Sequence, residues 1–113
     1  MDAYKHRRPP GEHARIAGLD QHTRHHVLLL LGEHPGLTVS SGRRSAHGNS
    51  RAGGSTRSYH LRGRAADFTG PLPLLQAAAE TAWRQRLSPR CTGPEEVILE
   101  DSGERNQHLH VAW

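Results

Sequence analysis

The sequence has one cysteine, few aromatic residues and no long apolar segment, and each shortage excludes a class of protein or site. Because Cys91 is the only cysteine, the chain can form neither an internal disulfide nor a cysteine-rich structural zinc site. Aromatic residues make up 4% of the chain, which leaves few of the stacking platforms that bind single-stranded nucleic acids. No segment approaches the roughly 20 consecutive apolar residues of a membrane-spanning helix, so we expect no membrane partner.

The length of the chain bounds the number of domains. With 113 residues it can enclose one modest hydrophobic core. Residues 1–14 are charged and proline-rich, with a break at Pro9, Pro10 and Gly11, and we interpret them as a flexible N-terminal arm. Residues 15–113 are the single predicted domain. No apolar signal core follows the arm, so we expect synthesis in the cytoplasm without a signal peptide.

The charge of the chain is biased toward cations. The 15 lysines and arginines outnumber the 11 acidic residues and give a formal net charge of +4. Such a surface favours polyanions, of which nucleic acid and an anionic cell wall are the candidates. The chain also has 10 histidines, most of which we interpret as a feature of composition. His22, His25 and His26 are interpreted as a polar helix face in solvent, because no carboxylate completes a metal-binding spacing.

The spacing of apolar residues predicts two helices and four strands. The first helix is expected over residues 15–31, and the second begins near the prolines at 71 and 73 and ends at residue 87. The strands are expected at residues 37–41, 64–69, 96–100 and 108–113. A loop over residues 42–57 and a hairpin between the last two strands complete the order. It predicts a small α+β domain with an antiparallel sheet of about four strands and two main helices.

The last predicted strand alternates between apolar and polar residues. Leu109, Val111 and Trp113 would face the core, and the histidines at positions 108 and 110 would share the opposite face. We also assign Trp83, on the second predicted helix, to the core.

His60, Asp67 and His110 supply the donor types of a catalytic zinc site. His60 precedes the second predicted strand, Asp67 lies on it, and His110 comes from the last strand, which we expect to be its neighbour. Imidazole nitrogen and carboxylate oxygen are good zinc donors, and three protein ligands leave a fourth position for water. Zinc lowers the pKa of that water and makes it a nucleophile, so one Zn²⁺ ion is predicted here.

A base has to accept the proton of that water. Glu100, at the end of the third strand, can sit across the hairpin from His110, and Glu104 in the hairpin loop is the alternative base. We prefer Glu100 because a strand end is more rigid than a loop tip. His108 could orient the base or donate to a developing oxyanion.

Two residues of the long predicted loop fit substrate binding. Arg44 can hold a substrate carboxylate by a bidentate contact, and Ser58 can add a hydrogen bond beside His60.

These residues follow one another in a recognisable order. It comprises Ser41-Gly42-Arg43-Arg44-Ser45, Asn49, Gly53-Gly54, Ser58-Tyr59-His60-Leu61-Arg62-Gly63-Arg64-Ala65-Ala66-Asp67, Glu100 and His108-Leu109-His110. The order resembles the zinc D-Ala-D-Ala carboxypeptidases and related peptidoglycan peptidases, which share the hedgehog/DD-peptidase fold. The short form of the chain resembles those encoded by bacteriophages, and the resemblance covers roughly residues 20–113.

The resemblance implies a function and a role for each matching residue. His60, Asp67 and His110 would bind zinc, a glutamate near the last histidine would be the base, and Arg44 would face the substrate. The implied reaction is hydrolysis of an amide bond next to a D-amino acid in the peptidoglycan stem peptide. The enzyme would be a D-Ala-D-Ala carboxypeptidase or an endopeptidase of the endolysin type, and the sequence leaves the bond open.

The stem peptide is therefore the expected partner, and the protein is expected to be a monomer. It would act on the cell wall after release from the cell, or travel in a phage virion. One alternative is a non-catalytic zinc-binding virion or binding protein of the same fold. A second is a basic nucleic-acid-binding protein, which would not need the ordered histidines and acidic residues.

Overall fold

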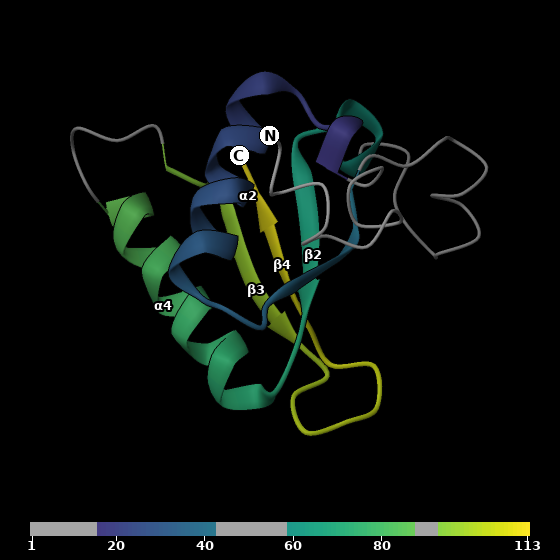
Figure 1. The fold of residues 1–113 in the computed structure, drawn as a ribbon, viewed down its shortest axis with the longest axis vertical. Coiled ribbons are helices and arrows are strands. Elements are labelled where there is room, and N and C mark those ends of the chain that lie inside the picture. Colours follow the sequence, from purple (N-terminus) through teal and green to yellow (C-terminus); the bar gives the residue numbers. More distant parts are fainter. Residues whose placement is uncertain (1–15, 43–58, 88–92) are drawn as a thin grey trace, which may run out of the picture.

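Two helices cover one face of a four-stranded sheet in the computed structural model, which describes residues 16–42, 59–87 and 93–113 (Figure 1). The elements follow the order α2 (Gln21–Glu33), β1 (Thr38–Ser41), the 3-10 helix η2 (Tyr59–Arg62), β2 (Ala65–Thr69), α4 (Leu72–Leu87), β3 (Glu96–Glu100) and β4 (His108–Ala112). None of the helices in these ranges combines the length and the apolar character of a membrane span.

The sheet has the strand order β1-β2-β4-β3, and every neighbouring pair is antiparallel. The central strands are therefore β2 and β4, although β2 precedes β4 by a whole helix and a third strand. The sheet and its two helices confirm the predicted α+β fold. The predicted arm at residues 1–14 and almost all of the predicted loop lie outside the described residues.

The hydrophobic core lies between the two helices and one face of the sheet. The helices contribute Val27, Leu30, Leu75 and Ala78, all fully buried. Alternate strand residues close the core from the other side: Val39, Ala66, Phe68, Leu109 and Val111. Because side chains alternate along a strand, the residues between them point to the opposite face of the sheet. The predicted core residues of the last strand are confirmed, including Trp113, which is 3% exposed.

The first predicted helix does not run unbroken from residue 15 to residue 31. The chain turns at Gly18–Asp20, and α2 begins after Asp20, whose side chain accepts a hydrogen bond from the backbone N–H of Thr23 at 2.8 Å. An aspartate in this position satisfies one of the free N–H groups of the first turn. Ile16 and Leu19 still reach the core from the preceding segment, which explains why their spacing looked helical.

Two predictions about ring side chains are wrong. Trp83 is 43% exposed and lies under the guanidinium of Arg86, 4.9 Å from the ring centroid, so it is not a core residue. His26 is 9% exposed and stacks on Trp113 at a centroid distance of 5.7 Å, so the face of α2 that carries three histidines is not wholly in solvent. Helical spacing groups residues on faces but does not identify the face that meets the sheet.

Replacing Phe68 with alanine should lower the free energy of unfolding by about 3–5 kcal/mol, because the ring is fully buried and would leave a cavity. The matched control is Trp83→Ala, which should cost about 1 kcal/mol or less because solvent already reaches that ring. Urea unfolding of both variants measures the difference. Equal losses would contradict the described core.

Candidate active site

The pairing of β2 with β4 brings two of the predicted donors together. In the antiparallel register Asp67 lies directly opposite His110, on the face of the sheet turned away from the helices. Directly opposed residues have Cβ atoms about 4.5–5.5 Å apart, so their side chains meet. The two donors come from positions 43 residues apart, and their meeting depends on this register.

The third predicted donor, His60, reaches the same point from η2, the short helix just before β2. A turn at Gly63 joins η2 to β2. Gly63 has a φ of +68°, a backbone angle that residues with a side chain rarely adopt. A Cβ atom there would lie 2.8 Å from the carbonyl oxygen of Gly18, so the position also lacks space for one. The Gly63 carbonyl accepts a hydrogen bond from the Asp20 N–H at 2.9 Å. This contact fixes η2 against the start of α2.

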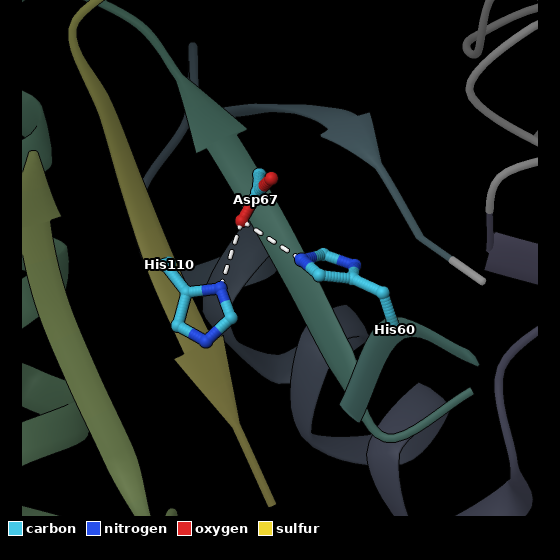
Figure 2. A group of neighbouring side chains, drawn as sticks. All are labelled: His60, Asp67 and His110. Carbon is cyan, nitrogen blue, oxygen red and sulfur yellow. Dashed lines mark hydrogen bonds and ion pairs between the residues drawn. The ribbon is translucent and has the colours of Figure 1, made fainter. Parts of the chain in front are cut away.

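The donor atoms of His60, Asp67 and His110 all lie within 4.8 Å of one another (Figure 2). Oδ1 of Asp67 is 3.2 Å from Nε2 of His60 and 3.0 Å from Nδ1 of His110. His60 is 2% exposed and Asp67 6%, so the carboxylate and one ring are shielded from water. Within the described residues this is the one group of three such side chains close enough to hold a metal ion.

The hydrogen bonds around His60 fit a bound cation. Its Nδ1 lies 2.7 Å from the Gly42 carbonyl oxygen, which can only accept, so Nδ1 carries the hydrogen. A metal-binding imidazole is neutral and has a single N–H, so a hydrogen held on Nδ1 would leave the Nε2 lone pair, next to Oδ1 of Asp67, for a metal. A cation between these two atoms would satisfy both, and His60, Asp67 and His110 are nitrogen and oxygen donors that zinc accepts.

Both rings shift the pKa of the carboxyl group between them. Burial acts most strongly on Asp67 and raises its pKa, but the hydrogen bonds with His110 and His60 outweigh burial and hold the pKa well below 3.8. Asp67 is therefore a carboxylate over the whole physiological range of pH. Burial has the opposite effect on a histidine and lowers the pKa of His110. The hydrogen bonds with Asp67 and Glu96 outweigh burial and raise this pKa above 6.5.

A pocket of about 640 Å³ opens over the three donors. The loop between β3 and β4 forms one of its walls, with Asp101, Arg105 and Asn106 among the lining residues. A hydrogen bond within the loop stabilises this wall, since Asn106 donates to the Asp101 carboxylate at 3.0 Å. Gln107 also donates to the Gly70 carbonyl at 3.1 Å, which ties the loop to the turn after β2.

Glu100 and His108 lie at the edge of this pocket, where β3 and β4 meet the loop. The register places Glu100 opposite His108 and not, as expected, opposite His110. Oε2 of Glu100 is 3.7 Å from Nε2 of His108, and Nδ1 of His108 donates to the Asn106 carbonyl at 2.9 Å. Glu104 is exposed and is not among the residues that line the pocket. Arg44 and Ser58, the predicted substrate-binding residues, lie outside the described residues.

Glu96 was not among the predicted site residues, yet its Oε1 lies 2.9 Å from Nε2 of His110. Alternation along β3 puts Glu96 on the same face as Glu100, so the sequence could have identified Glu96 as a carboxylate on the side of the sheet that carries the site. The register between β3 and β4 was still needed to bring Glu96 to His110. Arg105 was not predicted either. It is a cation in a pocket whose lining includes three carboxylates.

Zinc affinity should fall as the pH is lowered, beginning above pH 6.5. The raised pKa of His110 means that its ring holds a proton at a higher pH than in a free histidine, and a zinc ion that used this ring as a ligand would have to displace that proton. Competition with a chromophoric chelator between about pH 6 and pH 8.5 measures this dependence. An affinity that does not change across this range would contradict the role of His110 as a ligand.

Comparison with known proteins places this site in a family. A family model described as Peptidase M15 matches residues 21–112, a range that includes His60, Asp67, Glu100 and His110. No curated protein matched the chain. Since the match spans most of the chain and agrees with the cluster of possible metal donors, this protein belongs to the Peptidase M15 family, whose members are metal-dependent peptidases.

Proposed function

We propose that this protein is a zinc-dependent peptidase that hydrolyses an amide bond next to a D-amino acid in the peptidoglycan stem peptide. The observation that supports it most is that the group of His60, Asp67 and His110 lines an open pocket together with Glu100. Membership of the Peptidase M15 family supports the reaction class. D-Ala-D-Ala carboxypeptidase and endopeptidase activity are the two forms of this proposal.

His60, Asp67 and His110 would hold the zinc ion in this proposal. Bound there, zinc would lower the pKa of a water molecule and polarise the substrate carbonyl. The described hydrogen bonds already orient the donors, because the Gly42 carbonyl holds the far nitrogen of His60. The carboxylate of Asp67 stays ionised and so remains available as a donor.

Glu100 is the base in this proposal. It lines the pocket on the side of β3, where its carboxylate can accept a proton from the attacking water and return it to the leaving amine. His108 could support this transfer: in a neutral ring whose Nδ1–H is engaged by the Asn106 carbonyl, the Nε2 lone pair would lie 3.7 Å from Oε2 of Glu100. Once Glu100 has taken up the proton, the carboxylic acid can donate to that nitrogen. This geometry favours orientation of the base over donation to the oxyanion as the role of neutral His108.

Substrate binding completes the proposal. Arg44 and Ser58 are proposed to contact the substrate, with Arg44 on a substrate carboxylate. The protein is proposed to act as a monomer of the endolysin type, on the cell wall after release from the cell or as part of a phage virion. Residues 43–64 carry six arginines that a nucleic-acid site could use. One of them, Arg64, lies 3.6 Å from the Glu95 carboxylate and 5.1 Å from the centroid of the Tyr59 ring. Because Arg64 already contacts a carboxylate and an aromatic ring, it is less available to bind a phosphate, which speaks against the nucleic-acid alternative.

Incubation with purified peptidoglycan fragments should release defined products when zinc is present and none when a chelator is present. Mass spectrometry of the products identifies the bond, since loss of a terminal D-alanine and cleavage of a crosslink give different masses. Zinc binding without any cleavage would favour the non-catalytic protein of the same fold. Salt-dependent DNA binding that persists in chelator would favour the nucleic-acid alternative.

Glu100→Gln should retain zinc and lose activity by about 10²–10⁴-fold, because the amide cannot accept the proton. The matched control is Glu104→Gln, which removes the same charge from the neighbouring loop and should leave the rate unchanged. The turnover of both variants and their zinc content are the measurements. Full activity of Glu100→Gln together with loss in Glu104→Gln would assign the base to Glu104.

A further inference from the structure

Glu96 occupies a place that neither the motif nor the proposed reaction uses. It is the first residue of the edge strand β3, paired with Ala112 and therefore diagonal to His110 on the same face of the sheet. Its side chain is 40% exposed, and it is not among the residues that line the pocket. Glu96 therefore contacts the His110 ring on the side opposite to Asp67.

The two nitrogens of His110 face different carboxylates. Nδ1 lies 3.0 Å from Oδ1 of Asp67, inside the donor group, and Nε2 lies 2.9 Å from Oε1 of Glu96, outside it. A carboxylate oxygen accepts hydrogen bonds, so the nitrogen that contacts Glu96 is a donor. By the same rule Nδ1 donates to Asp67 when no metal is bound. A metal at Nδ1 would displace that proton, and the hydrogen held on Nε2 by Glu96 would then leave the Nδ1 lone pair for the metal.

His60 has the mirror arrangement with a different acceptor. There the outer nitrogen is Nδ1, and it donates to the buried backbone carbonyl of Gly42, which leaves Nε2, next to Asp67, as the nitrogen that a metal could use. With a metal bound, both rings would thus offer it the nitrogen next to Asp67, and an oxygen holds each ring from the other side. The backbone holds His60, whereas a side chain that can be substituted holds His110.

We propose that Glu96 is the positioning residue of the metal centre, which fixes the tautomer and ring orientation of His110 so that Nδ1 is offered to the metal. This inference rests on the proposed metal site, but it does not depend on which bond is hydrolysed. Carboxylates behind ligating histidines are a common feature of metal sites, and their removal typically weakens metal binding by about 10–100-fold.

Glu96 has a separate role from Glu100, although both residues lie on the same face of β3. Glu100 lines the pocket near His108, where a substrate could reach it, and Glu96 contacts the ring nitrogen that points away from Asp67. Loss of Glu100 should therefore reduce turnover, and loss of Glu96 should reduce metal affinity. The two substitutions separate a catalytic residue from a positioning residue.

The experiment measures zinc affinity by chelator competition in three variants of the full chain. Glu96→Ala removes the acceptor and should weaken zinc binding about 10–100-fold. Glu96→Gln keeps an oxygen that can accept from Nε2, so its loss should be smaller than that of the alanine variant. The control Glu95→Gln removes the neighbouring carboxylate charge, which faces Tyr59 and Arg64 and not His110, and should bind zinc like the unmodified chain.

A second measurement reports the ring directly. Nitrogen-15 NMR of the zinc-loaded protein should show His110 with its hydrogen on Nε2 and the metal on Nδ1, and Glu96→Ala should broaden or shift these signals. Circular dichroism checks that each variant is folded. If Glu96→Ala fails to fold, the glutamine variant and the NMR assignment on the unmodified chain still decide the question.

The outcomes separate this inference from the proposed function. Unchanged zinc affinity in both Glu96 variants, or a metal on Nε2 of His110, would overturn the role of Glu96 and leave the peptidase proposal standing. A wild-type chain that binds no zinc would overturn both. Zinc binding that depends on Glu96, in a protein that cleaves no peptidoglycan, would support the metal centre and refute the reaction.

Discussion

The antiparallel pairing of β2 with β4 is the constraint on which the rest of the structure depends. It places Asp67 opposite His110 on one face of the sheet and sends Phe68, Leu109 and Val111 into the core on the other. A shift of one residue would exchange the two faces, which would bury His110 and expose Leu109. The same alternation that encloses the core therefore also builds the metal-donor group, so stability and function select the same register.

The donor group depends on contacts from outside as much as on its own three residues. Gly63 permits the tight turn that brings His60 over β2, and the Gly42 carbonyl orients that ring. Glu96 contacts the outer nitrogen of His110 in the same way. Without such contacts a short polar cluster would have several hydrogen-bonding arrangements, and a metal ion would have to select one of them on binding.

Much of the local structure could be predicted from the sequence because it depends on residue type and local period. The alternation of the last strand put the two histidines on one face and Trp113 in the core, and the structure agrees. The limits of β3 were also predicted residue for residue. The unbroken first helix was wrong, since Asp20 can cap a new helix as well as continue one. The same kind of error placed Trp83 in the core, because helical spacing alone does not tell an inner face from an outer one.

The sequence by itself determined the fold class and the family, and it singled out the three side chains that the structure brings together, because a glycine turn, a strand period and donor chemistry are local properties. The tertiary structure decided which residues meet across strands. Glu100 lies opposite His108, and Glu96 contacts His110, because the register of β3 against β4 follows from the hairpin loop and the packing of Val97 and Leu99 on the core. Register is a relation between two segments, and neither segment carries it alone.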